Sequence, residues 1–306
     1  MGRALIRYRC SDAEHADWTG VVVAIVDNLW LAALTKNVDD AGTNNRFNLT
    51  ITSDGVDVVV RDFVIGWRMV RSGTGQTLRT GLRDGQAGIE TSNPHETPFE
   101  SAGLTHSSVR LGIRGDDAWS PEHVLLIGRT QPSFEPGRIV ALAMETEHSS
   151  SLSADSDEGH LTMRLRLVSP GNSATVIQRV LLLIYTDTGD DVETENSIQL
   201  QIGAGGGIVV HQTITDNLNP FTARWYVLDV ETPFTRGDMV ASGSIRLSIL
   251  GTDAWLPKTV FVFGLDTASG RPNEVVTLAS VPEWELGWLS TDPSEGSASV
   301  ALPLNV

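Results

Sequence analysis

The chain has 306 residues, a formal net charge of −16 and a hydrophobic content of 41%. The acidic excess excludes a nucleic-acid binder, because neutralising phosphates requires clustered Lys and Arg, and it disfavours adsorption to anionic lipid. The single cysteine, Cys10, excludes an intrachain disulfide. At about 100–200 residues per domain, this length predicts two domains.

The first residues, MGRALIRYRCSDAEHADW, do not read as a signal peptide, because Arg3, Arg7 and Arg9 interrupt the apolar stretches. The longest apolar runs further along, such as GVVVAIV and RVLLLIY, are too short to span a bilayer. We therefore expect a soluble protein, located in the cytoplasm or exported by a non-classical route.

The chain predicts β-strands throughout. Short runs of Val, Ile, Leu and Thr recur about every 8–14 residues and are separated by Gly, Asp, Asn, Ser and Pro. In chain order they include GVVVAIV, FNLTITS, VDVVVRDFVIGW, HVLLIG, RVLLLIY, IVVHQTIT, TVFVFG and EVVTLAS. No segment combines a sustained helical period with capping signals. Strands without intervening helices indicate antiparallel sheets and an all-β fold.

Two stretches of the chain are similar to each other. Ser108–Gly128 and Ser244–Gly264 align without a gap, and about half of their positions are identical. Shared positions include Asp117, Trp119 and Pro121 in the first stretch and Asp253, Trp255 and Pro257 in the second. A second pair of similar segments follows in the same order, LSADSDEG from Leu152 and LSTDPSEG from Leu289. This order predicts an internal duplication.

The duplication divides the chain into residues 1–170 (repeat 1) and 171–306 (repeat 2). The boundary lies in VSPGNSA, a segment rich in Pro, Gly, Ser and Asn. Repeat 1 carries an N-terminal extension and an insertion near 68–90, where RSGTGQTLRTGLRDGQAG indicates a long loop or hairpin. We expect two tandem antiparallel β-sandwiches related by internal duplication.

Two elements of the repeats resemble the PLAT/LH2 family. In repeat 1, DDAGTNNRFNLTI followed by DDAWSPEHVLLIG resembles this β-sandwich domain, which occurs in lipoxygenases, pancreatic lipases and the C-terminal half of clostridial alpha-toxin. Repeat 2 matches the second element well and the first loosely, since DVETEN stands where repeat 1 has DAGTNN. The resemblance spans about residues 20–168 and 176–306, and implies two packed four-stranded sheets in each unit.

The resemblance also implies calcium at one end of the sandwich, as in some members of the family. Calcium takes about six to eight oxygen ligands, often from flexible loops. The candidate ligands in repeat 1 are Asp40, Gly42, Thr43, Asn44, Asn93, Thr97 and Asp117. Those in repeat 2 are Asp191, Thr194, Glu195 and Asp253, with Asn217 or Asn219 in addition. Glu193 replaces the glycine of the family loop, which makes a tight turn harder there.

The same residue types have a structural interpretation, because Asp, Asn and Thr before a strand also form turns and cap backbone amides. Asp117 and Asp253 suit such a turn at least as well as a calcium site. We expect Trp119 and Trp255 to be core anchors. The proline two residues after each tryptophan is expected to end the loop and begin an edge strand.

No pattern of catalytic residues is present. The sequence has no Gly-x-Ser-x-Gly motif, and its seven histidines are scattered, with no pair four residues apart. The glycine-rich GAGGGIVV precedes a strand-like run, so it indicates a hairpin turn and not a phosphate loop. We therefore expect a protein without enzymatic activity.

Three functions follow from these features. The first is assembly with a protein partner through sandwich loops and edges, aided by calcium, for which the insertion could serve as a docking arm. The alternative is calcium-dependent docking on a membrane, although no aromatic residue stands directly before Asp117 or Asp253. The third is carbohydrate binding, for which an aromatic content of 6% is low. We expect the first.

Overall fold

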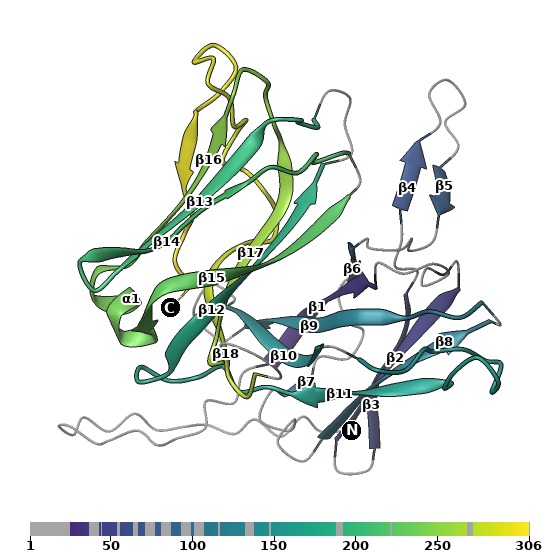
Figure 1. Ribbon diagram of the computed structural model, residues 1–306. Helices are drawn as coiled ribbons and strands as arrows, with labels where there is room; N and C mark the ends of the chain where they lie inside the picture. The colour runs from purple at the N-terminus through teal and green to yellow at the C-terminus, as the bar shows by residue number, and fades with distance from the viewer. Residues whose placement is uncertain are drawn as a thin grey trace, which may run out of the picture.

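The computed structural model describes residues 25–36, 43, 45–53, 56–63, 67–70, 77–80, 87–92, 99–100, 107–115, 117–131, 138–146, 148–187, 192–220, 222–267 and 272–305. Between residues 53 and 100 it describes the backbone alone. The described residues form an all-β fold with antiparallel strands and one short helix (Figure 1). In this part of the chain no helix is long and apolar enough to cross a membrane.

Repeat 1 is built from two antiparallel sheets. Its strands are β1 (Ile25–Thr35), β2 (Arg46–Ser53), β3 (Val56–Phe63), β4 (Trp67–Val70), β5 (Thr77–Thr80), β6 (Ala87–Ser92), β7 (Phe99–Glu100), β8 (Ser107–Arg114), β9 (Pro121–Gln131), β10 (Arg138–Thr146) and β11 (Thr162–Leu167). One sheet has the order β6-β1-β9-β10, with β7 beside the start of β1, and the other has the order β3-β2-β8-β11. A short pairing of β10 with β11 joins these two sheets, and a pairing of β6 with β15 continues the hydrogen-bonded path into repeat 2. Strands β4 and β5 form a separate hairpin.

Repeat 2 has the same plan. Its strands are β12 (Val176–Thr186), β13 (Ser197–Ala204), β14 (Gly207–Ile214), β15 (Ala223–Thr235), β16 (Ser244–Leu250), β17 (Pro257–Leu265), β18 (Val275–Val281) and β19 (Ser299–Ala301). The two sheets have the orders β15-β12-β17-β18 and β14-β13-β16-β19. Each strand holds the place of its counterpart in repeat 1, so the chain is two tandem sandwiches of one topology, as the duplicated sequence predicts.

The described residues form three apolar cores. One fills the sandwich of repeat 1, and a second fills the sandwich of repeat 2. A third, which we call the shared core, lies between the repeats. Its members from repeat 1 are Trp30, Ala32, Leu125, Ile127, Ile139, Ala141 and Met144, and those from repeat 2 are Leu181, Leu183, Ala223, Trp225, Phe261, Phe263, Leu265 and Val275. The sheet β6-β1-β9-β10 therefore packs against the sheet β15-β12-β17-β18.

The shared core explains why some strand sequences are continuously apolar and others alternate. Strand β13 alternates between buried and half-buried residues, because only one of its faces meets a core. Strand β12 buries five consecutive residues, from Val180 to Ile184, and β17 buries seven, because both faces of these strands are covered. The runs VLLLI and TVFVFG are thus the sequence signature of a strand between two cores.

The two repeats meet through equivalent surfaces. Thr35 and Thr186 end β1 and β12 in the same way, so Trp30 and Leu181 occupy equivalent positions in the duplication. Both belong to the shared core. The contact therefore resembles the isologous interface of a two-fold dimer, in which the same patch of each subunit is used. Its aromatic centre includes the edge-on pair Trp30–Phe261, with ring centroids 5.8 Å apart.

Four features differ from the sequence predictions. The insertion near 68–90 includes the hairpin β4–β5, but residues 87–90 belong to sheet strand β6. Pro121 and Pro257 begin β9 and β17, which are central strands and not edges. Helix α1 (Arg236–Ser242) was not expected; it is seven residues long and is held by a capping box between Thr235 and Asp238. The acidic, serine-rich segment ETEHSSSLSADSDEG predicts a solvated loop, but Leu152 within it is fully buried.

Candidate functional site

The repeated tryptophans anchor one end of each sandwich, which we call its motif end. Trp119 and Trp255 are both fully buried, so the prediction that they are core anchors is confirmed. The indole Nε1 of Trp119 donates a hydrogen bond to Thr35 Oγ1 at 3.0 Å, and Trp255 Nε1 donates to Thr186 Oγ1 at 3.3 Å. Each indole therefore fills the core while its one polar group is satisfied.

The backbone of each tryptophan also holds the next repeated segment. Trp119 and Leu152 exchange two backbone hydrogen bonds, at 2.8 and 2.7 Å. Trp255 and Leu289 exchange the equivalent pair, at 2.8 and 2.9 Å. The two similar blocks found in the sequence are thus two halves of one structural unit.

A threonine and an asparagine close the turn in front of each tryptophan. In repeat 1, Thr43 Oγ1 and Asn45 Nδ2 both donate to the carbonyl oxygen of Asp117, at 3.2 and 2.7 Å. Thr43 Oγ1 also accepts from the N–H of Asn45. In repeat 2, the N–H of Asn196 donates to Thr194 Oγ1, and the amide oxygen of Asn196 can accept from the N–H of Asp253 at 2.6 Å. Side chains thereby replace the missing backbone partners of the turn.

Gly251 is expected to be intolerant of a side chain. Its φ is +139°, and an added Cβ would lie 2.2 Å from the amide of Asn196. Gly251→Ala is therefore expected to lower the free energy of unfolding by about 1–3 kcal/mol. Gly207→Ala is the matched control, because nothing lies within 4 Å of its added Cβ. Equal urea midpoints for both variants and the wild type would contradict this account of the turn.

The second repeated segment forms an acidic turn at the same end. Ser153 Oγ donates to Glu158 Oε2 at 3.3 Å and accepts from the N–H of Asp155 at 3.0 Å. In repeat 2, Ser290 Oγ donates to Glu295 Oε2 at 3.0 Å and accepts from the N–H of Asp292 at 3.1 Å. The serine and the last acidic residue therefore fix the shape of the turn in both copies.

The stability contributed by Asp292 should depend on pH. The hydroxyl and the N–H of Ser294 donate to Asp292 Oδ1 and hold the pKa of this carboxyl below its usual 3.8. The ionised form therefore favours folding above about pH 4, and this contribution is lost as the pH falls through the lower, folded-state pKa. Urea unfolding should show that Asp292→Asn is less stable than wild type at neutral pH, and that the difference shrinks in acid. A difference independent of pH would contradict this prediction.

The structure tests only part of the predicted calcium site. Asp40, Gly42, Asn44, Asn93, Thr97 and Asp191 lie outside the described residues. Thr43 and Asp117 do come together, but through the hydrogen bonds that close the turn. Thr194 and Asp253 are likewise joined through Asn196, and Glu195 is exposed.

The described donors do not by themselves fit a calcium cage. The two hydrogen bonds to Asp117 are accepted by its backbone carbonyl oxygen in closing the turn, and they do not involve its carboxylate. No group of three or more His, Cys, Asp or Glu side chains in the described ranges is arranged to hold a metal ion. Calcium stays a prediction from the sequence. A rise in melting temperature with calcium and not with magnesium would confirm it, since a ligand of the folded state stabilises by mass action.

Several residues that build the motif end were missed at the sequence level. Thr35, Asn45 and Ser153 have the counterparts Thr186, Asn196 and Ser290 at matching positions of the duplication. Their identity in both copies was the available signal. It was missed because Asn and Ser in loops are ordinary residues until a partner is known.

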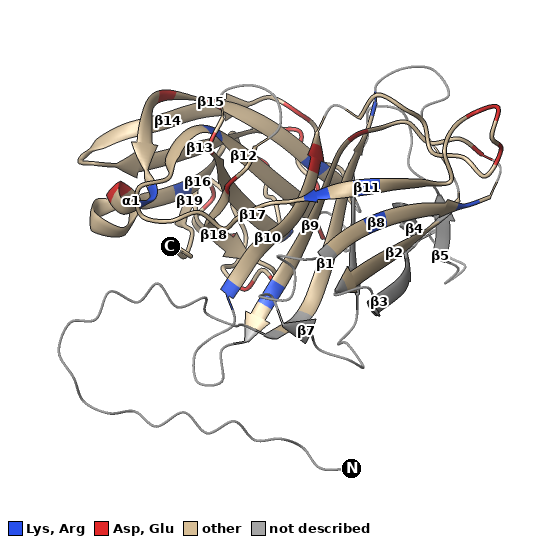
Figure 2. Ribbon diagram, turned by 90° about the horizontal axis from the view of Figure 1, so that it is seen from below, with Lys and Arg blue, Asp and Glu red and all other residues tan. Residues whose placement is uncertain are grey.

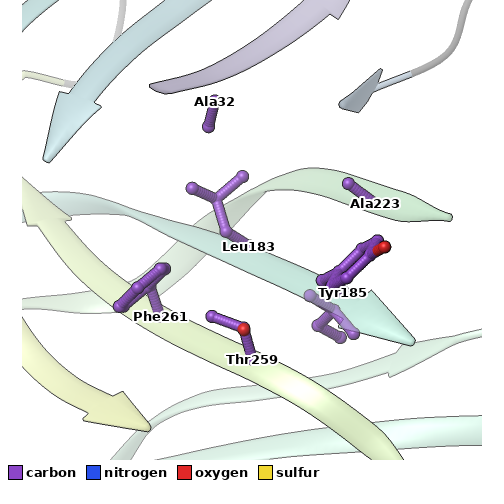
Figure 3. Close-up of a pocket in the computed structure, with 7 residues that line it drawn as sticks. Ala32, Leu183, Tyr185, Ala223, Thr259 and Phe261 are labelled. Carbon is purple, nitrogen blue, oxygen red and sulfur yellow. The ribbon is translucent and has the colours of Figure 1, made fainter. Parts of the chain in front are cut away.

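One small pocket lies between the repeats. This pocket in the shared core is lined by Ala32, Leu183, Ile184, Tyr185, Ala223, Thr259 and Phe261, and is mostly apolar (Figure 3). It has room for about one water molecule. Figure 2 shows acidic residues both in loops at strand ends and within strands such as β15.

Comparisons with known proteins do not assign a family. No family model and no curated protein matches this chain. Among solved structures, the A and B C2 domains of extended-synaptotagmin 2 match over 89% of this chain and 96% of that chain, at 9% sequence identity and a TM-score of 0.16. A TM-score this low carries no argument about the fold or the function of the chain.

Proposed function

We propose that the chain is a non-catalytic module that assembles with a protein partner through its loops and projecting strands. The rigid frame is the double sandwich, in which the shared core fixes the two repeats relative to each other. Such a frame holds loops at fixed positions, which lowers the ordering cost of binding. The PLAT/LH2 resemblance and calcium assistance belong to the same proposal.

The observation that carries the proposal is the hairpin β4–β5. It forms its own two-stranded sheet, and Figure 1 shows it standing away from the two sandwiches. In repeat 2, no strand lies between β14 and β15 at the corresponding point of the described chain. A lone two-stranded hairpin is marginally stable in water, so one that projects from a stable frame favours docking against another surface.

The register of the hairpin indicates the chemistry of its partner. Arg68 lies directly opposite Arg79, and Met69 lies opposite Leu78. The register therefore pairs two cationic positions directly and, at the next step along the strands, two apolar positions. Like charges in direct opposition destabilise a strand pair. An acidic partner surface would relieve that repulsion.

The test compares capture by the wild-type chain with capture by Arg68→Glu/Arg79→Glu, using extracts of the source and light scattering on the purified chain. The proposal expects a specific partner or self-assembly that the charge-reversed variant loses. Ile208→Ser, at an exposed position of β14, is the matched control and should retain it. Light scattering that shows a monomer, together with capture of the same background proteins by the wild type and both variants, would contradict the proposal. Binding of the chain to liposomes in the presence of calcium, without capture of any partner protein, would favour the membrane alternative.

A further inference from the structure

The motif end of repeat 2 is apolar where that of repeat 1 is polar. The duplication supplies a position-by-position comparison, because the same backbone bonds occur in both copies. The N–H of His148 donates to the carbonyl of Glu122, and the N–H of Trp284 donates to the carbonyl of Lys258. The N–H of His160 donates to the carbonyl of Ser151, and the N–H of Ser297 donates to the carbonyl of Trp288. Ser151 and Trp288 are therefore equivalent.

The change from polar to apolar is concerted. In repeat 1, Ser120 Oγ and Ser151 Oγ form a hydrogen bond at 2.7 Å. In repeat 2, the same two positions hold Leu256 and Trp288. The exposed Arg114 at the end of β8 corresponds to Leu250 at the end of β16, which is 42% exposed.

The segment Glu283–Trp288, which we call the tryptophan loop, adds further apolar surface. Leu286 is 41% exposed, and Trp284 and Trp288 are half-buried. Repeat 1 makes the same connection with Ser149 and Ser150 between its equivalent anchor residues. The fold therefore does not require an apolar loop at this end. An exposed apolar loop that the fold does not require indicates a binding surface.

The tryptophan loop is held in a fixed shape. Trp284 Nε1 donates to the carbonyl of Gly287 at 2.7 Å, and Gly287 has a φ of +81°. The ring of Trp284 also packs against the core of repeat 2. A rigid aromatic loop loses little conformational freedom on binding.

The charges around the loop indicate a cationic partner. Glu283, Glu285 and Asp253 are exposed at this end. The ammonium group of Lys258 lies 3.6 Å from the carboxylate of Asp187, which offsets its charge. Half-buried indoles bordered by carboxylates suit Arg side chains, which can form ion pairs and stack on aromatic rings. An anionic lipid surface would be repelled.

The chain itself contains a segment of this kind. Residues 1–10, MGRALIRYRC, place Arg3, Arg7 and Arg9 among Leu5, Ile6 and Tyr8, and the first acidic residue is Asp12. This segment lies outside the described residues, and in a chain of net charge −16 it is a concentrated basic and apolar stretch. We propose that residues 1–10 of one copy bind the tryptophan loop of a second copy.

A second copy suits the topology better than the same chain. Strand β1 runs from Ile25 to the motif end at Thr35, and β6 and β15 join the two repeats near that end through Ala87 and Ala223. The tryptophan loop lies at the motif end of repeat 2, whereas residue 25 lies about 33 Å, the length of β1, from the motif end of repeat 1. The residues between Cys10 and Ile25 reach about 50 Å at most. Contact between residues 1–10 and the tryptophan loop of the same chain would therefore require them to run back along the molecule in an extended form.

This inference rests on the proposed assembly function and names one contact of it. The native Cys10 allows a direct test, because it is the single cysteine. A thiol-directed photo-cross-linker is attached to Cys10 of the chain, which is mixed with an equal amount of 15N-labelled chain carrying Cys10→Ser. After illumination, mass spectrometry assigns each cross-link to the same chain or to the second copy.

The expected result is cross-linking from Cys10 to residues 283–295 of the 15N-labelled copy. Leu286→Ser/Trp288→Ser, which gives the loop the polarity of repeat 1, should reduce the cross-link yield about tenfold. Arg3→Ser/Arg7→Ser/Arg9→Ser should have the same effect. A tenfold reduction corresponds to a loss of about 1.4 kcal/mol in binding free energy. Ile208→Ser should not reduce the yield, because it lies beside the β13–β14 turn at the other end of the strands. Melting curves equal to wild type establish that the variants fold.

Cross-links confined to one chain, cross-links scattered over the surface, or yields unchanged in the serine variants would each overturn the inference. The proposed function would survive these results, because its own test is the charge reversal of the β4–β5 hairpin. A loss of capture on hairpin reversal without any Cys10 cross-link would therefore support an assembly module with a different contact.

Discussion

Phe261→Ala is expected to lower the free energy of unfolding by about 3–5 kcal/mol, the usual cost of removing a large aromatic side chain from a core. Phe261 is fully buried in the shared core, where it contacts Trp30 of repeat 1 and lies 6.0 Å from Phe263. The cavity would lie between the repeats and not inside either sandwich. The variant should therefore lose coupling between the repeats as well as stability.

Differential scanning calorimetry separates these two effects. We expect one cooperative transition for the wild type and a lower, broader or divided transition for Phe261→Ala. Val227→Ala is the control, because Val227 is 39% exposed on β15 and should change stability by less than about 0.5 kcal/mol. Two separate transitions already present in the wild type, unaffected by Phe261→Ala, would contradict a shared core.

Trp255→Ala should have a loss of similar size, about 3–5 kcal/mol, for a different reason. It empties the core of repeat 2 and leaves Thr186 Oγ1 without the indole N–H that it accepts. The backbone of Trp255 exchanges two hydrogen bonds with Leu289, which begins the segment of the acidic turn. Loss of the indole from the core should loosen the main chain at residue 255 and weaken these two bonds. Hydrogen exchange at Leu289 should therefore become faster in the variant.

Trp255→Phe separates packing from the hydrogen bond. It retains most of the apolar volume and removes Nε1, so we expect a smaller loss than for alanine, of which about 1 kcal/mol reflects the hydrogen bond. Trp119→Ala in repeat 1 should cost about as much as Trp255→Ala, since Trp119 is equally buried and packs edge-on against Phe47 at 4.5 Å. A tryptophan variant with wild-type stability would contradict the anchor role.

The sequence predicts the fold better than it predicts the chemistry of the loops. Alternation in SIQLQIGA indicates a strand with one covered face, and GAGGGIVV correctly indicates a hairpin turn, made by Gly205 and Gly206 with positive φ. The duplicated tryptophans predict buried anchors. These features depend on local backbone preferences and on burial, which a single sequence carries in its period and in its turn residues.

The shared core was not predicted, although its evidence is in the sequence. The runs VLLLI in β12 and TVFVFG in β17 lack alternation because both faces are covered. A single sequence does not say which second surface covers such a strand. The same limit applies to the motif end, where Thr43 and Asp117 suit calcium and turn closure equally until their partners, 74 positions apart, are known.

The central claim is that the two duplicated sandwiches form one unit through the core between them, and native-state hydrogen exchange tests it most directly. We predict that the slowest amides of β1 and β9 in repeat 1 and of β12 and β17 in repeat 2 exchange through one opening, with a common free energy and a common dependence on denaturant. Amides of β1 and β9 that exchange through a separate, lower-energy opening while β12 and β17 stay protected would contradict it.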